Sequence, residues 1–339
     1  MSAQAPLWIT EAEVVSMMDM GGAIEALEDG LLAEAGGTAE NMVKTHAVWG
    51  GGHTLHAIGA TFPEAGFVGT KTWAHTAGGA TPLLILFDSE NGSLRAIIEA
   101  FALGQMRTGS ASGVATRWLA EPGADQFAII GTGKQALTQV AAIVAVRPIQ
   151  RVRVFGRDRE RRSAFADRVR KEFQVEVTEA STVHEAVRSV PIVTIVTRAT
   201  EPVIFADMLT RGVHINAVGA ITPERAEISQ DVLDRCTCIA ADSVPQTQKL
   251  SRELMEYFGG PEKPGWQRVR PLSEIVASRR SRAADDDVTL FKALGMGVSD
   301  LALGIELYRK AVELGLGRKL EPPRKVSPRL RVSEPTRAS

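Results

Sequence analysis

Cysteine, net charge, aromatic residues and long apolar runs are all scarce in this chain of 339 residues. Its two cysteines, Cys236 and Cys238, form no Cys-x-x-Cys motif, and its six histidines lack metal-ligand spacing, so we expect no metal site. The net charge of −1 does not indicate the broad basic surface typical of nucleic-acid binding. No apolar run reaches the ~18 residues of a membrane-spanning helix, and no export signal opens the sequence. We therefore expect a cytoplasmic protein that binds neither nucleic acid nor membrane.

Glycine, by contrast, is abundant, and it divides the N-terminal third into short segments. Gly50-Gly51-Gly52 and Asn91-Gly92 predict turns between β-type runs. The runs that predict strands cover residues 44–49, 54–60, 66–73 and 82–87. Helical periodicity flanks this region. It predicts two short helices within residues 10–30, broken near Gly21-Gly22, and a closely packed helix of small residues over 97–119.

After Glu121-Pro122-Gly123 the pattern changes to strands that alternate with helices. The expected strands cover residues 127–130, 152–155, 175–177, 192–197, 214–217 and 238–240. This alternation predicts an α/β fold with a Rossmann-type doubly wound parallel sheet and right-handed crossovers. A last amphipathic helix is expected over 298–314. The basic, proline-rich tail from Lys319 on is expected to be mobile or to reach across a partner subunit.

A glycine turn follows the first of these strands and predicts a dinucleotide site. Residues 126–130 form an apolar strand, and the turn continues as Gly131, Thr132, Gly133, Lys134, Gln135 and Ala136 before a helix. The first glycine permits the tight turn, the second lets the main chain approach a pyrophosphate, and Ala136 lets the helix pack closely on the strand. The helix start then offers N–H groups to the anion. An ordinary glycine-rich strand–helix turn is the alternative reading.

The end of the second strand bears on the choice of dinucleotide. An enzyme that selects NAD usually places Asp or Glu there, to bind the ribose 2′-hydroxyl. Here the strand ends at Gly156-Arg157-Asp158, and Arg157 is suited to a 2′-phosphate. We therefore expect NADP(H) to be favoured, with NAD(H) possible. Alternatively, these charges belong to a solvated helix start and select nothing.

Three cations lie in apolar or small-residue surroundings outside the glycine turn: Lys44, Lys71 and Arg107. A half-buried cation without a nearby acid needs a counter-charge from elsewhere, and a substrate carboxylate would supply one. Three unrelated surface cations are the alternative. His75 would share the strand face of Lys71 and either line the pocket or simply pack, whereas Trp73 is expected to face away from Lys71.

Several motifs, in order over residues 10–315, resemble the ornithine cyclodeaminase/mu-crystallin family. They are Lys71 in its Gly-x-Lys strand, the block from Gly79-Ala80-Thr81-Pro82 to Asn91-Gly92, residues 106–112 around Arg107, the glycine turn, and the segments 215–220 and 290–295. The resemblance implies a substrate-binding and dimerisation domain, residues 1–121 completed by 298–339. It also implies an NAD(P)-binding Rossmann domain, residues 122–297, and a homodimer.

The resemblance also implies roles for individual residues. Lys71 and Arg107 match positions that hold the substrate carboxylate and act beside the reacting nitrogen. Lys44 stands where the family usually has an arginine, so its grip lacks the bidentate fork. The remaining expected contacts are His75, Thr81 and Gly295 for the substrate, and Thr197, Val218, Gly219 and Leu294 for the cofactor.

One departure separates branches of the family. Where the cyclodeaminases carry an aspartate, this chain has Ile221, which cannot accept a proton or orient an ammonium group. We therefore expect an NAD(P)H-dependent reductase of a small imino acid, or equivalently an amino-acid dehydrogenase, with Lys71 and Arg107 catalytic. A cyclodeaminase that recycles its NAD and a non-catalytic ligand-binding protein remain the alternatives.

Overall fold

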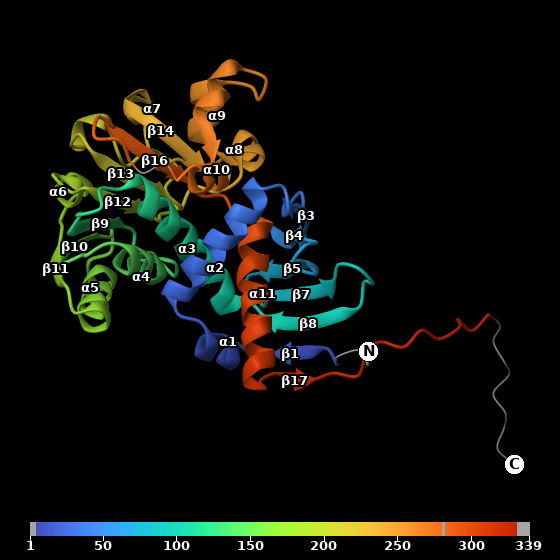
Figure 1. Ribbon diagram of the computed structural model, residues 1–339. Coiled ribbons are helices and arrows are strands. Elements are labelled where there is room, and N and C mark those ends of the chain that lie inside the picture. Colours follow the sequence, from blue (N-terminus) through green and yellow to red (C-terminus); the bar gives the residue numbers. More distant parts are fainter. Residues whose placement is uncertain (1–4, 280–281, 331–339) are drawn as a thin grey trace, which may run out of the picture.

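The computed structural model describes residues 5–279 and 282–330, and places a layer of long helices between two β-sheets (Figure 1). The helices of this layer are α2 (Met20–Ala35), α3 (Phe101–Leu119) and α11 (Gly297–Leu314), and α1 (Glu11–Met17) precedes them. Helix α11 packs on the first sheet, while α3 packs on the second. No helix among the described residues is long and apolar enough to cross a membrane.

The first sheet is mostly antiparallel and is built from the N-terminal residues plus one short C-terminal strand. Its strands are β1 (Leu7–Ile9), β2 (Glu40–Asn41), β3 (Thr45–Trp49), β4 (His53–Phe62), β5 (Phe67–Thr76), β6 (Gly79–Ala80), β7 (Leu83–Asp88), β8 (Leu94–Glu99) and β17 (Arg318–Lys319). They run in the order β17-β1-β8-β7-β5-β4-β2, with β3 on β4 and β6 on β5. The glycine-rich turn at residues 50–52 joins β3 to β4 as an antiparallel hairpin, as the sequence predicts.

The second sheet is parallel throughout and is the Rossmann-type half of the molecule. Its strands are β9 (Gln126–Ile130), β10 (Arg151–Phe155), β11 (Glu176–Glu179), β12 (Ile192–Ile195), β13 (Val213–Ala217), β14 (Cys236–Ala241), β15 (Val269–Pro271) and β16 (Val288–Lys292). They run in the order β11-β10-β9-β12-β13-β16-β14-β15. The chain thus leaves β9 in one direction and returns to its other side at β12, which creates a topological switch point between these strands.

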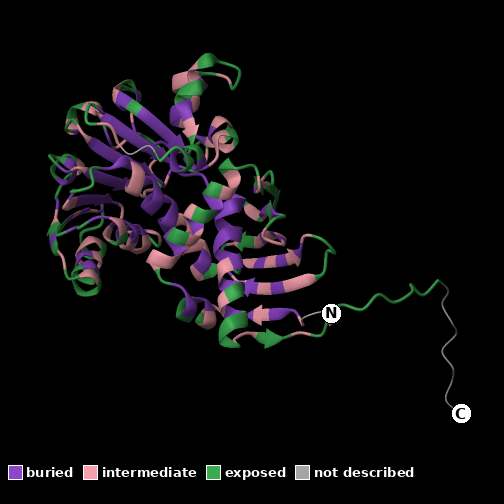
Figure 2. Cartoon of the chain, in the orientation of Figure 1, coloured by how far each residue is buried: buried purple, intermediate pink, exposed green. Residues whose placement is uncertain are grey.

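Helices cover this sheet, and its central strands are sealed from solvent. The helices are α4 (Ala136–Val146), α5 (Arg159–Phe173), α6 (Val183–Val187), α7 (Gln230–Arg235), α8 (Val244–Leu250), α9 (Arg252–Phe258) and α10 (Leu272–Ala277), with 3₁₀ turns η1 (Ala206–Met208) and η2 (Pro264–Arg268). Every residue of β12, β13 and β16 is buried, as Figure 2 shows for the interior of this half. Strands buried on both faces are typical of parallel sheets.

Helix α3 carries the small residues that the sequence associates with close packing, and they do bring helices together. A Cβ on Gly109 would lie 2.8 Å from the carbonyl oxygen of Thr138, and one on Gly113 would lie 2.6 Å from the Ile24 side chain. At the other end of α3, the buried Arg147 donates to the carbonyl oxygens of Thr116, Arg117, Ala120 and Glu121. The residue that ends α4 therefore holds the C-terminal end of α3.

Two local predictions are wrong. Residues 94–99 form strand β8, so α3 begins at Phe101 and not at Ile97; pairing with β1 on one side and β7 on the other outweighs the helical pattern. The break between the first helices lies at Met18–Asp19 and not at Gly21-Gly22, because Asp19 caps α2 by accepting from the Gly22 N–H at 2.8 Å. Beyond β17, residues 320–330 extend away from the body (Figure 1), and residues 331–339 of the predicted arm lie outside the described part.

Candidate active site

The glycine turn lies at the carboxyl end of β9, at the switch point, and its shape fits a dinucleotide phosphate. Gly131 has φ +113°, and a Cβ there would lie 2.6 Å from the carbonyl oxygen of Val196. A Cβ on Gly133 would face open space instead. Ala136 is fully buried at the start of α4, and no described side chain caps that helix. The Gly131 N–H donates to the Phe155 carbonyl oxygen at 2.8 Å, and the Ala136 N–H to that of Gly133 at 3.0 Å. The backbone of residues 132–135, with Thr132, Lys134 and Gln135, is therefore the part of the turn that can offer N–H groups at the switch point.

Arg157 follows β10 in an exposed position at the same edge of the sheet. The neighbouring charges are already used: Asp158 caps α5 by accepting from the Arg161 N–H at 2.9 Å, and Arg162 pairs with Glu179 at 3.2 Å. Asp158 therefore has one carboxylate oxygen engaged by its own helix.

The loops after β12 and β13 meet at a single buried carboxylate. Glu227 accepts from the Thr197 N–H at 2.7 Å and hydroxyl at 2.8 Å, and from the N–H groups of Gly219 at 2.7 Å and Ala220 at 3.0 Å. The two loops approach so closely that a Cβ on Gly219 would lie 2.1 Å from the Thr197 carbonyl oxygen. Val218, one residue earlier, is buried. The expected cofactor residues of these loops are thus held side by side.

A second buried carboxylate holds the loop after β16. Asp242, at the end of β14, accepts from the Leu294 N–H at 2.9 Å and the Gly295 N–H at 2.7 Å. Gly295 has φ +96°, and a Cβ there would lie 3.1 Å from a terminal nitrogen of Arg107. This loop therefore connects the edge of the parallel sheet to the predicted cations.

Two of those cations share one carboxylate, Asp300, in the first turns of α11. Lys71, from β5, donates to Oδ1 of Asp300, and Nε of Arg107, from α3, lies 3.4 Å from the same oxygen. Lys71 is 3% exposed and Asp300 is fully buried. Oδ2 of Asp300 and Nε of Arg107 make no hydrogen bond with any described residue. The cluster therefore retains unused hydrogen-bonding capacity.

Lys44, half-buried just before β3, belongs to the same electrostatic neighbourhood. Burial, and then the charge of Arg107, lower its pKa, while Asp242 and Asp300 act in the opposite direction. Burial also lowers the pKa of Lys71 to about 8; Asp300 opposes this shift and Arg107 adds to it. An ammonium group with a pKa near 8 can both hold an anion and exchange a proton near neutral pH.

The charges of this cluster do not balance. Lys71 and Arg107 pair with Asp300, and Lys44 and Arg107 also feel the charge of Asp242, so three cations are set against two carboxylates. Asp300 corrects the expectation that a substrate alone would supply the counter-charge, but it does so only in part. A further carboxylate would fit the remaining positive charge.

An aromatic row continues from Lys71 across the first sheet. The Lys71 ammonium lies 5.2 Å from the centre of the Trp73 ring, so the prediction that Trp73 faces away from Lys71 is wrong: residues two apart on a strand share a face. Trp73 stacks on His56 at 4.7 Å, and His56 stacks on His46 at 5.6 Å. Burial, then Lys44, lowers the pKa of His56 to about 4. His75 and Thr81 are both exposed, and neither makes a hydrogen bond to Lys44, Lys71 or Arg107.

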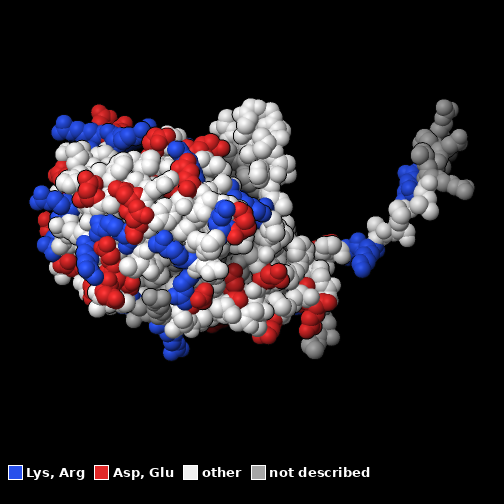
Figure 3. Space-filling model, turned by 90° about the horizontal axis from the view of Figure 1, so that it is seen from above, with Lys and Arg blue, Asp and Glu red and all other residues white. Residues whose placement is uncertain are grey.

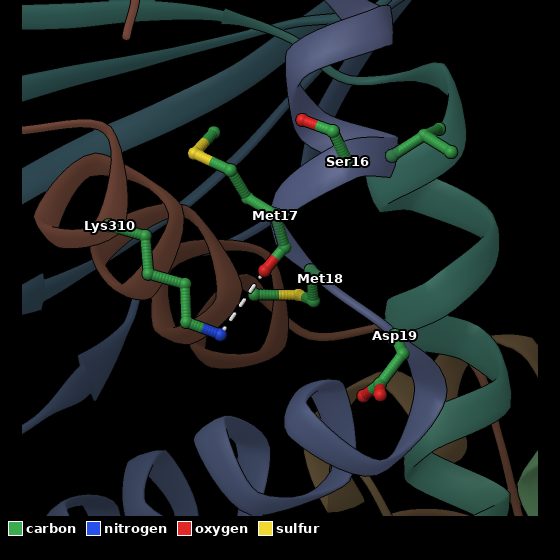
Figure 4. Close-up of a pocket in the computed structure, with 6 residues that line it drawn as sticks. Ser16, Met17, Met18, Asp19 and Lys310 are labelled. Carbon is green, nitrogen blue, oxygen red and sulfur yellow. Dashed lines mark hydrogen bonds between the residues drawn. The ribbon is translucent and has the colours of Figure 1, made fainter. Parts of the chain in front are cut away.

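A separate pocket of about 230 Å³ lies between α1, the start of α2 and α11 (Figure 4). It is lined by Val15, Ser16, Met17, Met18, Asp19 and Lys310, and Lys310 donates to the Met17 carbonyl oxygen at 3.2 Å. None of the predicted site residues lines it. Among the described residues, no group of three or more His, Cys, Asp or Glu could hold a metal ion.

Sequence reasoning missed Asp300, Asp242 and Glu227. Two of them had a weak signal: Asp300 interrupts an apolar helical run, and Asp242 directly follows a buried strand of a parallel sheet. The partners of these two lie far away in the chain, 229 residues for Lys71 and Asp300 and 52 residues for Leu294 and Asp242. Spacing within the sequence therefore could not pair them.

Comparisons with known proteins agree with this geometry. The profile of the ornithine cyclodeaminase/mu-crystallin family matches residues 7–314. The Delta(1)-pyrroline-2-carboxylate reductase of Bacillus cereus is 33% identical over 244 residues, which are 70% of this chain and 74% of the relative. The ketimine reductase mu-crystallin of Rattus norvegicus is 32% identical over 225 residues, 66% of this chain and 68% of the relative.

A solved structure shows the same likeness over nearly the whole chain. Thermococcus litoralis Delta(1)-pyrroline-2-carboxylate reductase, in complex with NADH and L-proline, matches with a TM-score of 0.85 at 26% identity, covering 93% of this chain and all of that one. An archaeal alanine dehydrogenase dimer with bound NAD matches with a TM-score of 0.86 at 25% identity, covering 94% and 99%. This chain belongs to the ornithine cyclodeaminase/mu-crystallin family.

Proposed function

We propose that the protein is an NAD(P)H-dependent oxidoreductase that reduces the C=N bond of a small imine bearing a carboxylate, or oxidises the corresponding amino acid. The observation that carries this proposal is the cluster of three cations, Lys71, Arg107 and Lys44, beside only two carboxylates, Asp300 and Asp242. The cluster lies against the Gly295 loop, at the edge of the sheet where dinucleotides bind in this fold. The names of the relatives, two reductases of cyclic imines among them, support the same chemistry.

The three cations bind the substrate carboxylate, and one of them, Lys71, also transfers a proton. When bound, the nicotinamide supplies or accepts the hydride. Arg107 and Lys44 bind the substrate carboxylate, and the fixed carboxylate aims the C=N carbon, which is a proximity effect. Lys71 joins this grip, and its ammonium gives a proton to the nitrogen directly or through water, as its pKa of about 8 allows. We propose that His75 and Thr81, both exposed, contact the remainder of the substrate.

A spectrophotometric screen tests the proposal. Preformed cyclic imines with a neighbouring carboxylate, and 2-oxo acids with ammonia or methylamine, are offered with NADH and with NADPH, and absorbance at 340 nm is followed. We expect net oxidation of the cofactor with at least one such imine. Ornithine consumed without any net change at 340 nm would instead identify a cyclodeaminase, and tight binding without turnover across the panel would identify a binding protein. Ile221, exposed where an acid would be needed, argues against the cyclodeaminase.

For the cofactor we propose NADP(H) over NAD(H). Arg157 is exposed at the end of β10, while Asp158 is engaged in capping α5. An arginine in this position suits a 2′-phosphate. We expect Arg157→Ala to lower the NADPH/NADH preference in kcat/KM by about tenfold, a typical effect of losing one charged contact. Arg159→Ala, an exposed arginine two residues later, is the matched control. An unchanged preference in the Arg157 variant would refute the assignment.

We also propose that the protein works in the cytoplasm as a homodimer, with residues 1–121 and 298–339 forming the substrate and dimerisation domain and 122–297 the dinucleotide domain. Residues 45–62, the β3–β4 hairpin, contain no Lys, Arg, Asp or Glu, and Val48, Trp49 and Leu55 are exposed there. Figure 3 shows a lobe without such charges beside a surface where both signs are mixed. An uncharged, apolar surface of this kind is typical of a subunit interface. Analytical ultracentrifugation of the full chain would measure the mass.

A further inference from the structure

Glu227, outside the cationic cluster, is the most heavily bonded side chain at the carboxyl edge of the parallel sheet. One of its oxygens accepts from the N–H and the hydroxyl of Thr197, and the other accepts from the N–H groups of Gly219 and Ala220. These donors belong to two loops that follow β12 and β13. A carboxylate that accepts several N–H groups fixes their directions, since each bond to a charged acceptor is stronger than a neutral one.

A buried ion pair supports Glu227 from behind. Lys292, at the end of β16, lies 3.1 Å from the carboxylate of Glu253 on α9, and both side chains are 1% exposed or less. Oε1 of Glu253 in turn accepts from the Glu227 N–H at 3.0 Å. The positive charge of Lys292 also acts on the Glu227 carboxylate, whose pKa burial raises. The ends of three neighbouring strands are thus joined through one buried network.

The Thr197 loop lies beside the glycine turn. The Cβ position of Gly131 is 2.6 Å from the Val196 carbonyl oxygen and 3.4 Å from the Thr197 methyl group. The short contact is made by Val196, whereas Glu227 bonds Thr197, so Glu227 fixes the loop beside the turn and not the turn itself. Position 219 tolerates only glycine, since a Cβ there would also lie 2.5 Å from Glu227 Oε1.

We propose that Glu227 is a positioning residue for the nicotinamide half of the dinucleotide: it holds the Thr197 loop and the Gly219–Ala220 loop in the one arrangement that this half of the cofactor recognises. Lys292 and Glu253 hold Glu227 itself. The glycine turn and Arg157, which would bind the adenosine and phosphate half, do not contact Glu227. This inference rests on the proposed function, because it takes the dinucleotide as the ligand of this edge.

Isothermal titration calorimetry with two probes tests it on the full chain. The probes are the preferred reduced dinucleotide and the matching ADP-ribose, with its 2′-phosphate if NADPH is preferred, which lacks the nicotinamide ring. Glu227→Gln keeps the shape of the side chain but replaces one accepting oxygen with an NH₂ group. This group is a donor and would face the N–H donors of one of the two loops. We expect it to weaken the dinucleotide about tenfold, on the order of one charged hydrogen bond, and to leave ADP-ribose within about twofold.

Two further variants keep the outcome clear. Glu185→Gln is the matched control, because this exposed carboxylate also accepts a backbone N–H, from Ser181 at 2.7 Å, yet lies on α6. Thr197→Val removes the hydroxyl that donates to Glu227 and accepts from the Ala199 N–H, but keeps the Thr197 N–H bond to Glu227. If Glu227→Gln does not fold, this variant should give a smaller loss that again falls on the dinucleotide and not on ADP-ribose. The inference is overturned if Glu227→Gln binds each probe as tightly as the wild-type protein does. It is also overturned if the variant loses the same factor of affinity for both probes. A wild-type chain that binds neither probe would refute the proposed function instead.

Discussion

Two buried clusters of charge lie near the same edge of the molecule, and they differ in how completely their groups are satisfied. Around Asp300, Lys71 and Arg107 share one carboxylate, and an oxygen and a guanidinium nitrogen remain without hydrogen bonds among the described residues. Around Lys292, the carboxylates of Glu227 and Glu253 accept from backbone N–H groups, hydroxyls and the lysine itself. We call the Asp300 cluster, with Lys44, Lys71 and Arg107, the open cluster, because it has hydrogen-bonding groups left for a ligand. We call Lys292, Glu227 and Glu253 the closed cluster, because their bonds are complete without one.

This difference predicts which property, turnover or stability, is lost when the lysine of each cluster is removed. A buried pair that loses one partner leaves an uncompensated charge, which costs about 3–5 kcal/mol. In the cluster around Lys292, no other Lys or Arg of the described part of the chain pairs with Glu227 or Glu253. In the open cluster Arg107 remains 3.4 Å from Asp300 when Lys71 is removed. Removal of Lys71 should therefore affect turnover, and removal of Lys292 should affect stability.

The largest expected effect is on turnover in the open cluster. Lys71→Met removes a carboxylate contact and the proposed proton donor, so we expect kcat to fall by about 10²–10⁴-fold, the usual contribution of a positioned acid or base. Dinucleotide affinity, measured by calorimetry, should stay intact. Lys171→Met, an exposed lysine on α5, is the control and should keep full activity. A Lys71 variant that loses dinucleotide binding would contradict the division between the two clusters.

The next effect is on stability in the closed cluster. Lys292→Met leaves Glu227 and Glu253 buried without a cation, so the free energy of unfolding in urea should drop by about 3–5 kcal/mol. The same measurement on Lys71→Met should show a clearly smaller loss. If both variants lost equal stability, the two clusters would not differ in the way their hydrogen bonds indicate.

The smallest effect is on how kcat/KM depends on pH, and only the open cluster should cause it. Lys71 is charged below its pKa of about 8, so in the reducing direction kcat/KM should be level at lower pH and fall about tenfold per unit above it. Asp300 raises this pKa, and Asp300→Asn should therefore move the decline to lower pH. The residual activity of Lys71→Met should lack the decline. Persistence of the same decline in that variant would assign it to the substrate or the cofactor.

The sequence predicts best the features that depend on neighbours in the chain. The glycine turn, the alternation of buried strands with helices and the β3–β4 hairpin follow from local patterns, and the structure has them where expected. The order β11-β10-β9-β12-β13 then follows from the Rossmann reading, but the return of β16 between β13 and β14 does not. The sequence also does not predict the strand at residues 94–99, because this strand depends on pairing with β1 and β7.

The site shows the same limit at the level of single residues. Lys71 and Arg107 were found because a cation in apolar surroundings is conspicuous by itself. The sequence does not single out Asp300, because an acidic residue near the start of a helix is common and is explained by its favourable interaction with the helix dipole. The face of Trp73 was misjudged although strand periodicity places residues 71 and 73 together, and the structure corrects it.

Helix α3 gives the open cluster a mechanical property. Its first half carries Arg107 into contact with Asp300, whereas Arg147 and the packing of Gly109 tie it to the nucleotide half. Lys71 instead lies on β5 of the first sheet, so the two cations are positioned by different elements. A displacement of the nucleotide half relative to the first sheet would reach Arg107 through α3 and change its distance from Lys71, and a spectroscopic distance measurement between α3 and β5 would report it.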